Sequence, residues 1–101
     1  MKKLWPTIVV ALCALSAYAQ GTMTVTLSGK FIVSTDTRVI EIFDRNCNRS
    51  LGQFSLRGNA NIQLNICKNG AGYGNVQYRN VTNNGSWIGA SQLKAGEEIS
   101  P

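Results

Sequence analysis

Residues 38–67 read RVIEIFDRNCNRSLGQFSLRGNANIQLNIC, and this stretch decides the fold. It combines the densest alternation of apolar and polar residues in the chain with two of the three cysteines. The alternation predicts strands over residues 38–44, 52–56 and 59–66. A polar corner between the first two strands carries Cys47, and the third strand runs into Cys67. We therefore expect three neighbouring strands, closed at one end by a disulfide, to form the centre of the fold.

The third of these strands has the cleanest pattern. Apolar residues occupy every second position, and Asn or Gln occupies the positions between them. Successive side chains of a strand point to opposite faces, so the apolar set (Ala60, Ile62, Leu64 and Ile66) should face the core. Continuing this register puts Cys67 on the solvent face or just past the strand end, and the disulfide at the rim of the sheet. The first strand carries apolar residues on both faces, which predicts a central strand covered on each side.

Working outward, the flanking segments add further short strands. Residues 22–27 alternate strictly, residues 30–33 form a short apolar run, and residues 76–81 and 86–88 lie on either side of Asn83-Asn84-Gly85, a strong hairpin signal. The tail offers either a helical turn at residues 91–94 or a last strand near residues 98–99. Turn signals recur and helical periodicity is absent. The predicted fold is all-β, a small antiparallel β-sandwich or barrel of about six to eight short strands with one disulfide.

The aromatic residues are expected in the core of this small fold. Buried aromatic side chains contribute much of the apolar area in small domains. We expect Trp87 to be the largest core side chain, together with the other aromatic residues of the strands, namely Phe31, Phe43, Phe54 and Tyr78. The alternative is that Trp87 is a surface aromatic that binds a ligand.

The N-terminal segment has the pattern of a secretory signal peptide. Lys2 and Lys3 precede an apolar run over residues 7–17, and Ala17-Tyr18-Ala19 is a small-x-small cleavage motif. Cleavage after Ala19 would divide the chain into a signal peptide (residues 1–19) and a single β-domain (residues 20–101), which would be secreted or periplasmic. A bilayer span needs about 20 consecutive apolar residues, and the run over residues 7–17 is shorter than that. We therefore expect no membrane span.

The cysteine count fits an exported domain. Cys13 lies within the signal-like run, which leaves Cys47 and Cys67 as one pair. A single pair in an exported chain predicts a structural disulfide, since redox-active pairs are usually spaced C-x-x-C. Closing this loop should stabilise the fold by about 3 kcal/mol.

The charge distribution argues against nucleic acid as a partner. The net charge of +5 falls to +3 when Lys2 and Lys3 are removed. The remaining Lys and Arg residues are scattered, and only Arg45, Arg49 and Arg57 approach a cluster. Proteins that bind nucleic acid usually gather their cations on one face. We read the excess charge as a solubilising surface with some attraction to anionic envelopes.

The sequence lacks the residues that most enzymes use. It has no histidine and only five acidic residues, which removes the commonest general base and most triads and zinc sites. Residues 44–50 match the opening D-x-N-x-N of a calcium loop, but Arg49 stands where glycine is required and Ser55 where the bidentate glutamate belongs. We interpret this segment as a turn whose Asp and Asn side chains cap its own backbone. A weak β-type calcium site remains an alternative, and we expect no enzyme activity and no cofactor.

Two polar segments are the best candidates for a contact surface. One is the loop at residues 68–75, which contains three glycines and Tyr73; the other is the corner that carries Arg45 and Arg49. Loops carried by a rigid scaffold often bind, and tyrosine supplies contact area at low entropy cost. The predicted partner-binding residues are Arg45, Arg49, Lys68, Tyr73 and Asn75.

The sequence therefore predicts a secreted, non-enzymatic binding module. Its partner would be an extracellular or periplasmic protein or an envelope glycan. The alternative is a small secreted cationic effector, either a toxin or an enzyme inhibitor, because export, a disulfide and small size suit that role equally well. The pattern leaves the oligomeric state open.

Overall fold

A computed structural model of the chain describes residues 21–101, and the signal peptide predicted at residues 1–19 lies outside the described residues. The described part contains seven strands and no helix. They are β1 (Thr22–Ser28), β2 (Thr37–Asp44), β3 (Arg49–Arg57), β4 (Asn61–Cys67), β5 (Gly74–Asn80), β6 (Ile88–Leu93) and β7 (Glu98–Ile99). The all-β prediction and the expected number of strands are confirmed.

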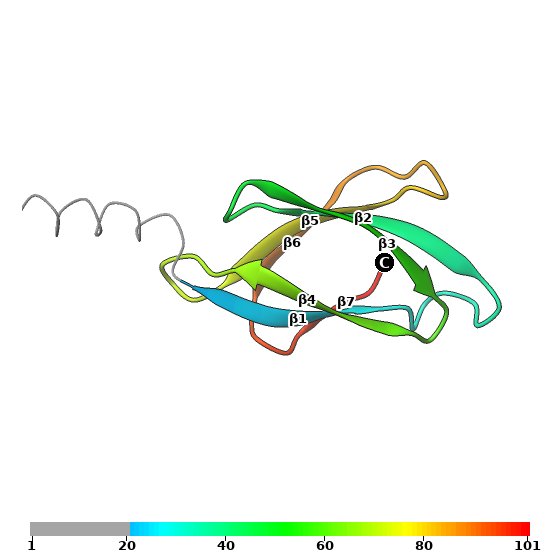
Figure 1. Cartoon of the computed structure of the whole chain (residues 1–101), viewed down its shortest axis with the longest axis horizontal. Coiled ribbons are helices and arrows are strands. Elements are labelled where there is room, and N and C mark those ends of the chain that lie inside the picture. Colours follow the sequence, from blue (N-terminus) through cyan, green and yellow to red (C-terminus); the bar gives the residue numbers. More distant parts are fainter. Residues whose placement is uncertain (1–20) are drawn as a thin grey trace, which may run out of the picture.

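The strands form two sheets that face each other as a sandwich (Figure 1). One sheet has three strands in the order β4-β1-β7, and the other has four in the order β3-β2-β5-β6. β1 pairs antiparallel with β4 along its whole length, and the short β7 runs parallel to β1. β2 has antiparallel neighbours on both sides, β3 and β5, so it is a central strand of its sheet, as predicted. The expectation that both of its faces are covered is only partly met, because Ile40 and Ile42 are buried whereas Val39 and Phe43 are half-buried.

The core lies between the two sheets and is aliphatic. β1 contributes alternate residues, Met23, Val25 and Leu27, while Thr22 and Thr24 are exposed on its other face. The opposing sheet contributes Ile40 and Ile42, both fully buried. The other buried apolar residues are Ile32, Leu56, Leu64, Ile66, Cys67, Val76, Leu93 and Ile99.

The prediction that Trp87 and Phe31 are core residues is wrong. Trp87 is 42% exposed and Phe31 is 74% exposed. Residues 30–33 form a turn and a bend rather than a strand, so only Ile32 of that run reaches the core. Trp87 directly precedes β6, and its ring lies against the guanidinium of Arg79, 4.9 Å from the ring centroid. Phe43, Phe54 and Tyr78 are half-buried.

Two local predictions also need correction. Residues 91–93 belong to β6 rather than to a helical turn, while the alternative of a last strand at Glu98–Ile99 is confirmed. Cys67 is only 4% exposed, so it does not lie on the solvent face. Its backbone N–H donates to the buried carboxylate of Asp44, and the turn that follows Asp44 covers this end of β4. Within residues 21–101, no helix has the length and apolar character needed to cross a membrane.

Candidate binding site at the disulfide-linked end

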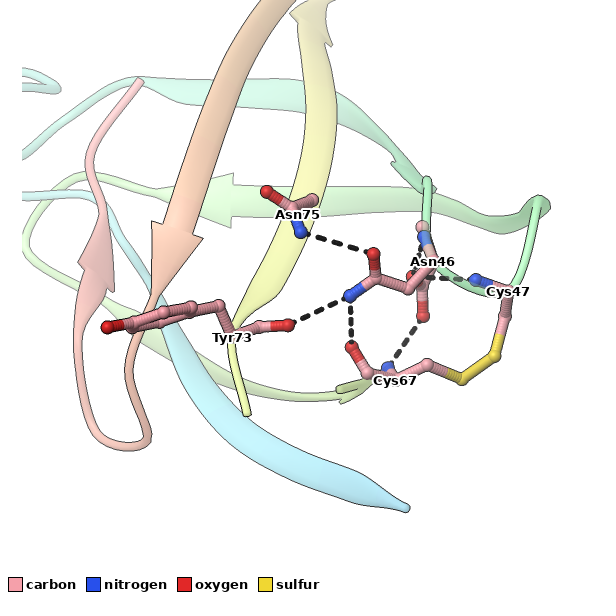
Figure 2. The surroundings of a disulfide bond; sticks show 6 residues. Asn46, Cys47, Cys67, Tyr73 and Asn75 are labelled. Atoms are coloured by element: carbon pink, nitrogen blue, oxygen red, sulfur yellow. Dashed lines mark hydrogen bonds between the residues drawn. A yellow bond between two sulfur atoms is a disulfide. The ribbon is translucent and has the colours of Figure 1, made fainter. Parts of the chain in front are cut away.

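The candidate site lies at the end of the sandwich where β2 and β4 finish. We call it the disulfide end and define it as the β2–β3 turn (residues 45–48) together with the β4–β5 loop (residues 68–73). Cys47 of the turn is bonded to Cys67 of β4, with their Cα atoms 5.9 Å apart. Because β2 and β4 belong to different sheets, the predicted disulfide joins the two layers of the sandwich (Figure 2).

Asp44 organises the inner side of this end. Its side chain is fully buried, and its carboxylate accepts hydrogen bonds from three backbone N–H groups: Asn46 at 3.1 Å, Cys47 at 3.3 Å and Cys67 at 2.8 Å. A buried carboxylate is costly unless it is hydrogen-bonded, and these three donors satisfy it. Asp44 therefore holds the turn closed and attaches it to β4. The interpretation of this segment as a self-capping turn is confirmed.

Asn46 connects the turn to the loop. Its side-chain Nδ2 donates to the carbonyl oxygens of Cys67 and Tyr73, each at 2.9 Å. Its Oδ1 accepts a hydrogen bond of 3.1 Å from Nδ2 of Asn75, at the start of β5 (Figure 2). One side chain thus bonds to three separate points of the chain. The sequence analysis did not select Asn46, because nothing in the local pattern distinguishes it from Asn48.

The glycine-rich loop is closed by bonds of its own. Oδ1 of Asn69 accepts from the N–H groups of Ala71 and Tyr73, at 2.9 and 3.0 Å. The N–H of Asn69 donates to the carbonyl oxygen of Tyr73 at 2.9 Å. Gly72 has a φ of +87°, a conformation that glycine adopts without strain. The loop is therefore a compact turn that keeps residues 70–72 exposed.

Three of the five predicted partner-binding residues lie in the disulfide end itself, and Arg49 and Asn75 adjoin it at the starts of β3 and β5. The five have two different roles. Arg45 and Arg49 are exposed, and Lys68 and Tyr73 are half-buried. Asn75 is also half-buried, but both polar atoms of its amide bond within the protein, since Oδ1 accepts from the N–H of Gln92 at 3.1 Å. Asn75 therefore positions the loop, and the other four residues are left to present a surface.

The exposed charge at the disulfide end is positive. Three ion pairs are found among residues 21–101, namely Lys30–Glu98, Arg38–Asp36 and Arg79–Glu41. Arg45, Arg49 and Lys68 take part in none of them. The acid nearest to them in sequence, Asp44, is buried and bonded inward. Cations at this end are thus available to an external anionic group.

Asp44, Cys47 and Cys67 have the composition of a metal-binding cluster, but their bonding does not fit one. The side-chain ligand atoms of Asp44, Cys47 and Cys67 all lie within 4.8 Å of one another. A metal would need the sulfurs as thiolates, but here they are bonded to each other. The oxygens of Asp44 and Asn46, which open the calcium-like pattern, are engaged by protein donors. These groups serve to close the turn.

Comparison with known proteins adds no assignment: no protein-family model, no curated protein and no solved structure matches this chain.

Proposed function

We propose that the protein is an exported, non-enzymatic β-domain that binds a macromolecular partner through its disulfide end. The partner is an extracellular or periplasmic protein or glycan with an anionic surface. The observation that carries the proposal is that two segments far apart in sequence are fastened side by side by Asn46 and the Cys47–Cys67 disulfide. Arg45 and Arg49 beside them are exposed and form no ion pair within residues 21–101.

Pre-organisation supports a binding role. A loop that must be ordered on binding loses part of its interaction energy to that ordering, whereas a loop already closed does not. Here the turn and the loop are closed by the bonds of Asp44, Asn46 and Asn69 before any partner arrives. Exposed cations then steer an anionic partner toward this end. The disulfide is compatible with an extracellular location.

The acidic residues support a non-enzymatic role. Among residues 21–101, three of them are held in ion pairs and Asp44 is buried among backbone donors. The fifth, Glu97, accepts a hydrogen bond of 2.6 Å from the N–H of Lys94. The chain has no histidine. Each acid within residues 21–101 thus has a partner, and none is the buried, unpaired carboxylate that a tuned general acid or base requires.

The test is retention of the protein, recovered from its own secreted fraction, on a lipid-free envelope fraction of the cells that produce it. We compare the wild type with the double variant Arg45→Gln/Arg49→Gln over a range of salt concentrations. Removing two unpaired cations should weaken retention at least fivefold at low salt and flatten its salt dependence. Urea unfolding of both proteins checks that they are equally folded.

The matched control is Asn83→Asp/Ser86→Asp. It changes the net charge by the same amount, at two exposed positions in the connection between β5 and β6. Its retention should stay within twofold of the wild type. If the arginine variant is retained as well as the wild type, or if both variants lose retention equally, the disulfide end is not the binding site.

A further inference from the structure

The end of the sandwich opposite the disulfide presents apolar side chains to solvent. The β1–β2 loop (residues 29–36) carries Phe31, 74% exposed, and Val33, 63% exposed. Ile32 lies between them in sequence but is only 9% exposed and belongs to the core. Ile32 therefore anchors the loop to the core, while Phe31 and Val33 on either side of it are exposed to solvent.

This exposure belongs to a loop with fixed contacts. Five backbone hydrogen bonds hold it. Two are within the loop: the N–H of Ile32 donates to the oxygen of Gly29 at 3.0 Å, and that of Asp36 to Val33 at 2.8 Å. Three join it to the β3–β4 turn: Gly29 to Ala60 at 2.8 Å, Gly58 to Asp36 at 3.0 Å and Asn59 to Gly29 at 2.9 Å. The loop also packs directly against the β3–β4 turn. A Cβ atom at Gly58 would lie 2.1 Å from the oxygen of Val33, so only glycine allows this approach.

The charges around the two apolar side chains are cationic or neutralised. The ammonium of Lys30 lies 5.4 Å from the centroid of the Phe31 ring. Arg57, at the end of β3, is exposed and forms no ion pair within residues 21–101. The acids at this end, Asp36 and Glu98, are held in ion pairs with Arg38 and Lys30.

The position of the loop separates it from the disulfide end. In Figure 1 the β1–β2 loop projects at one end of the sandwich, and the β2–β3 turn and the β4–β5 loop lie at the other. A projecting loop tip with two apolar side chains and an adjacent exposed cation matches a fluid lipid surface, which needs no complementary recess. Trp87 is less exposed, at 42%, against 74% for Phe31 and 63% for Val33.

We propose that the β1–β2 loop docks on the surface of an anionic lipid bilayer. Phe31 and Val33 enter the boundary between headgroups and acyl chains, and Arg57 contacts a lipid phosphate. Apolar insertion supplies most of the attachment, and Arg57 supplies the preference for anionic lipid. This surface is distinct from the partner-binding end, so the domain would bind a membrane at one end and a partner at the other.

The test is co-sedimentation with vesicles of phosphatidylcholine alone and of phosphatidylcholine mixed with phosphatidylglycerol. The wild type should bind the mixed vesicles and bind the neutral ones less. Phe31→Ser/Val33→Ser should lower binding to the mixed vesicles at least tenfold, and Arg57→Gln should lower it about threefold. Ile88→Ser is the control, because Ile88 is also an exposed apolar residue (53%) but lies on β6.

Each outcome decides the proposal. It is overturned if the wild type binds neither vesicle, if Ile88→Ser loses as much binding as the double variant, or if Arg45→Gln/Arg49→Gln alone abolishes binding. The same variants separate this proposal from the previous one. Loss of Phe31 and Val33 should leave retention on a lipid-free envelope fraction unchanged; if that retention falls and vesicle binding does not, the loop contacts a protein and the lipid proposal fails.

Discussion

The two ends of the sandwich are both held in place, but by different means. At the disulfide end, a covalent bond and side-chain hydrogen bonds from Asp44 and Asn46 fasten the turn to the loop. At the opposite end, backbone packs on backbone through Gly29 and Gly58, with hydrogen bonds between main-chain atoms. The disulfide end is held by polar side chains, whereas the opposite end requires glycine, because a Cβ atom would prevent the close contact.

This difference determines what each end shows to solvent. Where Asp44, Asn46 and Asn75 turn inward to satisfy backbone groups, the outward positions are left to Arg45 and Arg49. Where the contact is made by glycine and main-chain atoms, the loop side chains are free to point outward. At the disulfide end, several polar side chains are used in internal hydrogen bonds, so fewer of them are displayed to solvent. At the opposite end, glycine and main-chain atoms make the contact, so most loop side chains are exposed to solvent.

Asp44→Ala should have the largest effect, because it removes the buried acceptor of three N–H groups. The N–H of Cys67 is buried, and those of Asn46 and Cys47 are half-buried. An unsatisfied buried donor costs about 1 to 3 kcal/mol and a half-buried one less, so we expect a loss of about 3 to 4 kcal/mol in the free energy of unfolding. That is a large part of the stability of a small domain. Urea unfolding of the oxidised protein measures it.

The control for this change is Asp36→Ala. Asp36 pairs with Arg38 near the surface, where its side chain is 40% exposed. Such pairs contribute about 1 kcal/mol or less, so this variant should remain close to the wild type. Equal losses in the two variants would show that the buried network does not hold the disulfide end.

Gly58→Ala should have the next largest effect. It disrupts the packing of the β1–β2 loop on the β3–β4 turn, at the end opposite the disulfide. The added Cβ would lie 2.1 Å from the oxygen of Val33 and 2.7 Å from Cα of Ser34, both backbone atoms that cannot rotate away. Forcing the loop outward should cost about 2 to 3 kcal/mol. Hydrogen exchange at Ile32 and Asp36, whose amides bond within the loop, should accelerate.

Gly70→Ala is the matched control in the β4–β5 loop. A Cβ there would meet nothing within 4 Å. The substitution should therefore change stability by less than about 1 kcal/mol, in either direction. A loss at Gly70 as large as that at Gly58 would mean that the two ends are not held by the different means described above.

The fold could be predicted where the pattern is local. The alternation in residues 22–27 and 59–66 has the period of a strand. It correctly predicted Leu64 and Ile66 as core residues, whereas Ala60 and Ile62 on the same predicted face are half-buried. Phe31 and Trp87 were placed wrongly because a short apolar run does not show whether its segment joins a sheet. Phe31 lies in a turn, and Trp87 lies just before a strand.

The sequence predicted the two segments of the candidate site, but it did not predict the hydrogen bonds that join them. Composition pointed to the corner and to the glycine-rich loop, and cysteine pairing brought Cys47 and Cys67 together. The role of Asn46 depends on carbonyl oxygens 21 and 27 residues further along the chain. Asn48 has the same side chain two residues away, yet it is exposed and has a φ of +51°. The different roles of Asn46 and Asn48 can be recognised only from the tertiary structure.

Asn46→Ala tests the difference between these two residues and should have the smallest effect of the three main substitutions, Asp44→Ala, Gly58→Ala and Asn46→Ala. It removes the bonds to Cys67, Tyr73 and Asn75, and a loss of roughly 1 to 2 kcal/mol should follow, because the disulfide and Asp44 remain. Asn48→Gly in the same turn should change stability by less than about 1 kcal/mol, since glycine adopts positive φ without strain. The decisive measurement is the amide NMR spectrum of residues 68–75. These resonances should shift in Asn46→Ala and not in Asn48→Gly. If they stay in place in both variants, the disulfide and Asp44 alone position the loop, and Asn46 does not pre-organise the binding end.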